Sequence, residues 1–235
     1  MRADSIVKDC ELIRKTLLGN ETKWTVLGQS FGGFCVMTYL SLAPEGLQQA
    51  LLTGGLPPVY QGCSADEVYG YTYKRAAERS LRFYERYPQH VKTVRDIMEL
   101  LEANPQPLPD GGILTSRRFQ QLGLALGSAT GIENLHYLLE NPWQAELRDP
   151  QPQPAATRST PAATAATRKL SFEFLKSVEA QSSFESSVMY AIGHEAIYCN
   201  GKGEASAWSA QRIKASFPEF DVAAALKVRS RYFST

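Results

Sequence analysis

The pentapeptide GQSFG at residues 28–32 constrains this chain most, because it places a polar serine inside an otherwise apolar segment. The residues before it, 23–27, are apolar and β-prone, and they predict a short buried strand. The residues after it, 34–42, predict a mostly apolar helix that stops near Pro44. A G-x-S-x-G pattern between a strand and a helix indicates a nucleophile elbow, a sharp turn that holds a serine in strained backbone geometry.

Ser30 is the expected nucleophile of this elbow, and Gly28 and Gly32 are the small residues expected to permit the turn. The amide of Phe31 is expected to donate to the oxyanion that forms during acyl transfer, with the positive end of the following helix directed at the same place. A serine nucleophile also needs an imidazole to take its proton and a carboxylate to orient that imidazole. All three histidines fall in predicted helices, where each is expected to be solvated or packed in a core: His90, His136 and His194.

The order of elements around the elbow predicts an α/β fold with a parallel sheet over residues 1–58. A second strand is expected at 50–53, and an amphipathic helix ending near Gly19 is expected before the elbow. Apolar residues at helical spacing mark that helix: Ile6, Cys10, Ile13 and Leu17.

Residues 59–220 have a helical pattern and predict a large cap subdomain, with no strand of similar quality between 59 and 144. Within the cap, residues 151–168 repeat Pro, Ala and Thr without any large apolar side chain. Such a segment cannot bury enough surface to offset the entropy of ordering, so it is expected to be a disordered insertion. Residues 221–235 are expected to form a C-terminal tail.

Composition excludes several classes of function. A net charge of +1 gives no basic tract for nucleic acid or an anionic membrane, and no apolar run is long enough to span a bilayer. The four cysteines lack metal-ligand spacing, and Tyr198 stands where an H-E-x-x-H zinc motif starting at His194 needs its second histidine. We therefore expect no metal and no cofactor, and a reducing cytoplasmic location.

Several segments resemble the proline iminopeptidase family of α/β-hydrolases, the bacterial and fungal prolyl aminopeptidases. The similarity includes "KWTVLGQSFGGFCVMTYLSLAPEGL", "LLTGGLPP", "LTSRRFQQLGLALG" and "YAIGHEAIYCNG", and it covers most of the chain. The resemblance implies a serine exopeptidase that releases an N-terminal residue, preferably proline, from short peptides. It also implies that Glu195 in the cap binds the free amino group of the substrate. The motifs give no oligomeric state.

The resemblance also implies parts that this sequence lacks. Family members carry a His-Gly-Gly-type oxyanion loop before the elbow, and a catalytic Asp and His on strands after the cap. The chain is therefore expected to be a partial α/β-hydrolase, a fragment or incomplete gene model, with little or no activity as given. Two alternatives stay open: a non-catalytic remnant that binds a peptide or protein partner, and an α/β-hydrolase that acts on esters.

Overall fold

The computed structural model describes residues 2–58, 63–144, 168–181, 183–199 and 203–227. The chain divides into two compact units, each described here by itself. The first comprises Met1–Tyr71 and Ser187–Ile213, and the second comprises Thr72–Ser186 and Lys214–Thr235. The expected core at 1–58, cap at 59–220 and tail at 221–235 stay predictions, and the Pro/Ala/Thr segment up to residue 167 lies outside the described residues.

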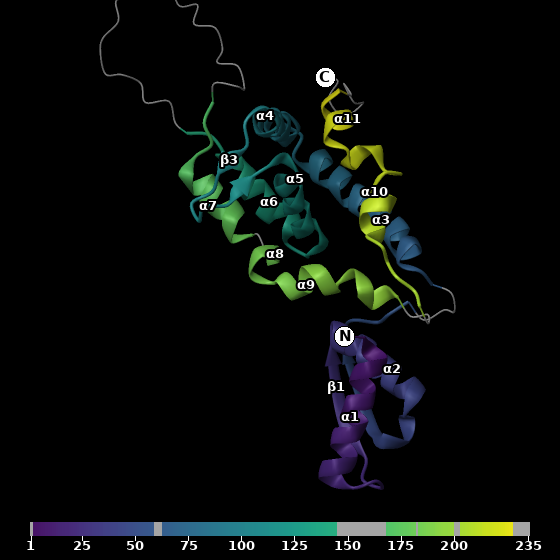
Figure 1. The fold of residues 1–235 in the computed structure, drawn as a ribbon. Helices are drawn as coiled ribbons and strands as arrows, with labels where there is room; N and C mark the ends of the chain where they lie inside the picture. Colours follow the sequence, from purple (N-terminus) through teal and green to yellow (C-terminus); the bar gives the residue numbers. More distant parts are fainter. Residues whose placement is uncertain (1, 59–62, 145–167, 182, 200–202, 228–235) are drawn as a thin grey trace, which may run out of the picture. The chain divides into compact units, whose positions relative to one another are not determined.

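The first unit is built around two parallel strands joined by a helix (Figure 1). Strand β1 (Trp24–Gln29) leads into α2 (Phe31–Leu42), a short 3₁₀ turn η1 (Pro44–Gly46) and β2 (Leu47–Thr53). The register pairs Val26 with Ala50 and Leu27 with Leu51. The strand–helix–strand order predicted from the sequence is confirmed.

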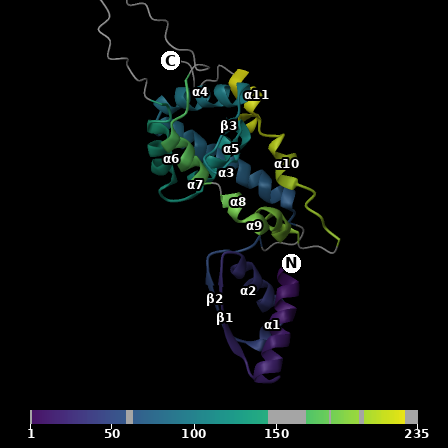
Figure 2. The same ribbon diagram turned by 60° about the vertical axis from the view of Figure 1, so that its left-hand side comes forward.

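Helix α1 (Ala3–Leu18) precedes β1 and ends at Gly19, whose φ of 85° stops the helix. Figure 2 shows α1 and α2 on one side of the two strands. On the other face of this pair, Leu27 and Leu51 are exposed, so only one face of the two-stranded sheet is covered within the described residues.

The buried face of α1 differs from the face that the sequence pattern marked as apolar. Ile13 and Leu17 are exposed, whereas Val7, Glu11 and Arg14 are buried. The reason is an ion pair: Arg14 donates two hydrogen bonds of 2.8 Å to the Glu11 carboxylate. A buried charged pair with satisfied partners replaces the apolar contact that simple amphipathicity predicts.

The first unit also contains three short helical segments from later in the chain. They are α9 (Val188–Gly193), η4 (Glu195–Tyr198) and α10 (Ser209–Lys214), whose last residue belongs to the second unit. Helix α3 (Ala65–Arg86) begins in the first unit and continues in the second.

The second unit is helical and encloses a continuous apolar core. Side chains from several elements meet there, among them Phe83 of α3, Ile97 and Leu101 of α4, Leu139 of α6 and Val178 of α7. The elements are α4 (Gln89–Ala103), α5 (Ser116–Gln120), η2 (Gln121–Gly127), α6 (Gly131–Glu140), α7 (Phe172–Ala180), α8 (Ser183–Ser186), η5 (Pro218–Phe220) and α11 (Val222–Lys227). The predicted helical character is confirmed.

One feature of the second unit was not predicted. A small antiparallel pair, β3 (Gln106–Pro107) and β4 (Ile113–Leu114), lies between α4 and α5. The amide of Leu108 donates to the Gly112 carbonyl at 2.7 Å, and Gly111 adopts a φ of 88° in the connecting turn. Strands of two residues are too short to show a period of two, so no strand pattern is recognisable at these positions.

Candidate active site

Ser30 occupies the turn between β1 and α2, and its backbone is strained. Its φ of 53° and ψ of −121° lie outside the regions that an L-residue prefers. Ser30 is exposed, and it lies at the N-terminus of α2. Strand, strained serine and helix in immediate succession are the geometry of a nucleophile elbow.

Close backbone contacts around Ser30 explain why glycines surround it. A Cβ on Gly28 would overlap the Gly32 carbonyl, and a Cβ on Gly55, where φ is 74°, would overlap the carbonyl of Ser30. Gly33 likewise faces the carbonyl of Gly54.

The position of Gly32 differs from the sequence argument in one respect. A Cβ there would meet no atom within 4 Å, so close approach does not require glycine at this position. The tight contacts instead involve Gly33 and Gly55. The Gly-Gly pairs at 32–33 and 54–55, two of the three in the sequence, were the available signal for these positions.

Phe31 is the first residue of α2, as the oxyanion role requires. The first N–H groups of a helix have no acceptor within the helix, so they remain available to bind a negative charge. The Gly33 amide is engaged already, since it donates to the Ser30 carbonyl at 2.9 Å.

Within the described residues of the first unit, no side chain provides a base for Ser30. Its hydroxyl makes no hydrogen bond within the described part of the chain. His90 and His136 belong to the second unit, and His90 is packed in the core as expected. His194 lies in the first unit between the rings of Tyr190 and Tyr198, and burial lowers its pKa.

A row of aromatic rings lies next to the elbow in the first unit. Phe31 and Phe34 of α2 have ring centroids 5.9 Å apart, and Phe34 meets the edge of Tyr198 at 6.1 Å. The ring of Tyr69 of α3 lies 6.0 Å from that of Tyr198. These four rings are here called the aromatic row; Tyr198 is more than 100 residues from the other three, which is why sequence reasoning did not find the row.

Glu195 is buried, and its carboxylate binds the start of α10. One oxygen accepts from the Ser209 amide at 2.7 Å, and the other accepts from the Ala210 amide at 2.9 Å. Burial alone would raise the pKa of Glu195, but hydrogen bonds from Ser206 and these two amides outweigh burial and lower it. Glu195 is therefore ionised, and these three donors leave one lone pair of the carboxylate free.

The turn before α10 is strained and firmly held. Ala207 and Trp208 have φ values of 48° and 57°, in the left-handed region. Arg212 donates to the Ala207 carbonyl at 2.5 Å and pairs with Asp66 at 2.5 Å. These contacts, together with those of Glu195, offset the cost of the backbone strain and present the Trp208 side chain to solvent.

No group of three or more His, Cys, Asp or Glu side chains in the described ranges could hold a metal ion. None of the helices that the structure describes is long and apolar enough to cross a membrane.

Comparison with known proteins places this geometry in context. A family model for the alpha/beta hydrolase fold matches residues 1–150. The chain is 41% identical over 217 residues to a proline iminopeptidase of Aeromonas sobria, covering 92% of this chain and 45% of that protein. It is 32% identical over 225 residues to proline iminopeptidase aneH of Aspergillus aculeatus, covering 94% of this chain and 45% of that protein. The chain therefore spans about half the length of the curated relatives it matches, and the resemblance seen in the sequence motifs is confirmed.

Proposed function

Because the chain belongs to the alpha/beta hydrolase fold family, we propose that it carries the nucleophile of a serine aminopeptidase that releases N-terminal proline from short peptides. The observation that carries the proposal is the strained Ser30 at the β1–α2 turn, next to Gly28, Gly33 and Gly55, where close backbone contacts leave no room for a Cβ. Strain of this kind is maintained where a side chain must be presented for chemistry.

The proposed mechanism starts with Ser30. Its Oγ attacks the carbonyl carbon of the scissile bond while the Phe31 amide donates to the developing oxyanion. The proton of Ser30 must pass to an imidazole, which then protonates the leaving amine. A water molecule later hydrolyses the acyl-enzyme by the same route.

Substrate selection is proposed to use two features of the first unit. The aromatic row offers an apolar surface for the side chain of the first substrate residue. Glu195 is ionised and retains one free lone pair, so it is proposed to accept from the substrate's free ammonium group. The proposed ligands are therefore short peptides with an unblocked N-terminus, and no metal or cofactor takes part.

A second candidate function follows from the surroundings of Ser30. Because no imidazole reaches its hydroxyl within the described residues, the 235 residues are proposed to turn over substrate slowly or not at all. Loss of the base typically lowers the rate by several orders of magnitude. A chain in this state would bind peptides without cleaving them.

One experiment separates these functions. The chain is treated with a fluorophosphonate probe, and turnover of a proline chromogenic amide is measured in parallel, each with Ser30→Ala as the control. Labelling that Ser30→Ala abolishes supports the nucleophile, and amide turnover that it abolishes supports the peptidase. Peptide binding without labelling favours the non-catalytic function, and hydrolysis of p-nitrophenyl acetate alone favours an esterase. Amide turnover retained in Ser30→Ala would contradict the proposed mechanism.

A further inference from the structure

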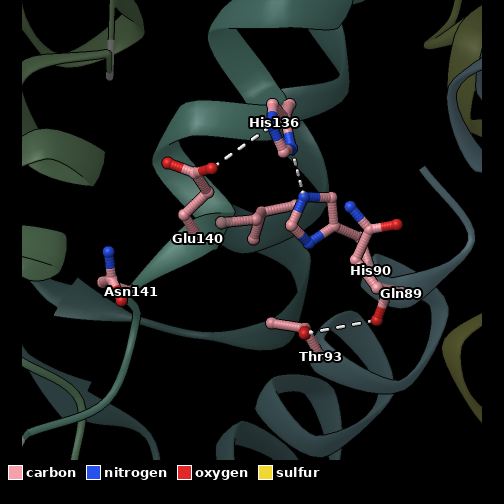
Figure 3. A pocket seen from close by; sticks show the side chains of 7 residues that line it. Gln89, His90, Thr93, His136, Glu140 and Asn141 are labelled. Carbon is pink, nitrogen blue, oxygen red and sulfur yellow. Dashed lines mark hydrogen bonds and ion pairs between the residues drawn. The ribbon is translucent and has the colours of Figure 1, made fainter. Parts of the chain in front are cut away.

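A polar pocket in the second unit lies between α4 and α6, apart from the residues assigned to catalysis (Figure 3). Its volume is about 360 Å³. The lining side chains are those of Gln89, His90, Thr93, His136, Leu139, Glu140 and Asn141. One carboxylate and no lysine or arginine belong to this set, so the pocket favours a cation over an anion.

Two histidines and Glu140 form a continuous chain at this pocket. Nε2 of His90 lies 2.7 Å from Nδ1 of His136, and Nε2 of His136 lies 3.3 Å from Oε1 of Glu140. An ionised carboxylate only accepts, so Nε2 of His136 carries a proton. With both rings neutral, Nδ1 of His136 then accepts from Nε2 of His90, and Nδ1 of His90 holds a lone pair.

That lone pair has no partner. His90 is 2% exposed, and its Nδ1 is buried without a hydrogen bond. A buried acceptor without a donor destabilises the folded protein, so binding of a ligand that donates to this nitrogen is favoured. Figure 3 shows this nitrogen directed away from His136, on the side of Thr93. The Thr93 hydroxyl makes only a long contact of 3.5 Å to the Gln89 carbonyl. Rotation of the Thr93 side chain therefore breaks no strong hydrogen bond and would open access to Nδ1 of His90.

Stacking fixes the orientation of both imidazoles. The ring of His136 lies parallel to Tyr87 at a centroid distance of 3.9 Å, and the ring of His90 lies parallel to Phe83 at 5.7 Å. The acceptors are therefore in place before any ligand enters, which reduces the entropy lost on binding.

The geometry points to a binding site for a small primary ammonium group in this pocket, with Glu140 as its counter-charge and the neutral His90–His136 pair as an acceptor. An ammonium head supplies both the positive charge and the N–H donors that these groups lack. A short alkyl tail packs on Leu139. The inference does not depend on the function proposed for Ser30.

Protonation of the histidine pair competes with the ligand. Burial and the nearby charge of His136 lower the pKa of His90, whereas Glu140 acts in the opposite direction. Two ion pairs lie on the packed elements, Arg86 with Glu133 and Lys92 with Asp96, and α4 also carries Arg95, Glu99 and Glu102. A proton on the pair adds positive charge to the pocket, so ammonium binding weakens as the pH falls below the ordinary histidine range.

The test uses the full chain and nuclear magnetic resonance of the imidazole nitrogens. Ethylammonium chloride is expected to shift the His90 and His136 signals saturably at pH 8, and more weakly at pH 5.5. Tetramethylammonium chloride has the same charge without an N–H donor and is expected to leave the signals unchanged, as is sodium acetate.

Two variants complete the test. Glu140→Gln keeps an acceptor for His136 but removes the charge, and it is expected to weaken ethylammonium binding about fivefold or more. Glu78→Gln is the matched control, because Glu78 is similarly exposed on α3 and does not line the pocket. His90→Phe preserves the stacked shape and is expected to abolish binding. Equal shifts from both cations, unchanged binding in Glu140→Gln, or no saturable shift in the parent chain would each overturn the inference.

Discussion

Each of the two units buries a network of polar side chains, and the two networks differ in whether every polar atom has a hydrogen-bond partner. In the first unit, Arg14 donates to Glu11 and to the carbonyls of residues 19, 20 and 22. Tyr39 donates to Glu11 and accepts from Trp24, so the side-chain polar groups of Glu11, Arg14, Trp24 and Tyr39 all have partners. In the second unit, the chain from Glu140 through His136 ends at a nitrogen of His90 that has none.

This difference separates a structural network from a candidate binding site. A satisfied buried network fixes α1 against α2 and leaves no group to bind a ligand. A network with an unpaired acceptor beside a pocket is less stable by itself and gains from a donor. The four predictions below test this comparison, from the largest expected effect to the smallest.

Arg14→Met is expected to have the largest effect. Because Arg14 is 2% exposed, the substitution leaves the buried Glu11 carboxylate with the half-exposed Lys15, 3.4 Å away, as its remaining cation, and unfolding should become easier by about 3 kcal/mol. Chemical denaturation followed by Trp24 fluorescence measures the loss. Combining Arg14→Met with Glu11→Leu should recover much of it, and a double variant as unstable as the single one would contradict the charge explanation.

Acid is expected to weaken the first network next. The hydrogen bond from Arg14 lowers the pKa of Glu11 to about 2, below its ordinary value of 4.5. A lowered carboxyl pKa means that the stability is present above pH 4.5 and is lost as the pH falls towards 2. Hydrogen exchange in α1 should therefore speed up across this window. Glu11→Gln should remove this dependence, and an unchanged acid profile in that variant would place the effect elsewhere.

Tyr39→Phe should have a smaller effect on the same network. The substitution removes the donor to Glu11 and leaves the Trp24 indole N–H without its acceptor, at a cost of about 1–3 kcal/mol. It should also shift the Trp24 emission. Because burial and the bond to Glu11 raise the pKa of Tyr39 to about 12, the parent phenol should not titrate below pH 10 in an absorbance measurement.

His90→Phe is expected to have the smallest effect at neutral pH, because the new ring can stack on Phe83 and the removal of the unpaired Nδ1 offsets part of the loss of the hydrogen bond to His136. Burial lowers the pKa of His90 below 6.5, so the unfolded chain binds the proton more readily. The parent protein should thus lose stability in α4 as the pH falls below 6.5, and His90→Phe should flatten this dependence. Hydrogen exchange in α4 at pH 7.5 and 5.5 is the measurement, and an equal slope in both proteins would count against it.

Much of the fold could be predicted because its signals are local. The strand at β1, the GQSFG turn and the helix at α2 follow from neighbouring residues, and the positions of α3, α4 and α6 follow from apolar periodicity. The face of α1 could not be predicted in this way, since Glu11 and Arg14 are polar and are buried only because they meet each other and Tyr39. The sequence predicted that a strand ends just before Gly55. The contact of Gly55 with Ser30, however, depends on the pairing of β2 with β1.

The sequence by itself determined the class of the fold, the elbow and its serine, because strand and helix propensities and a glycine-rich turn act over a few residues. Only the tertiary structure decided which side chains surround Ser30, that Glu195 binds the start of α10, and that His90 meets His136. These residues are 14 to more than 100 positions from their partners, and contacts over such separations depend on how the helices pack.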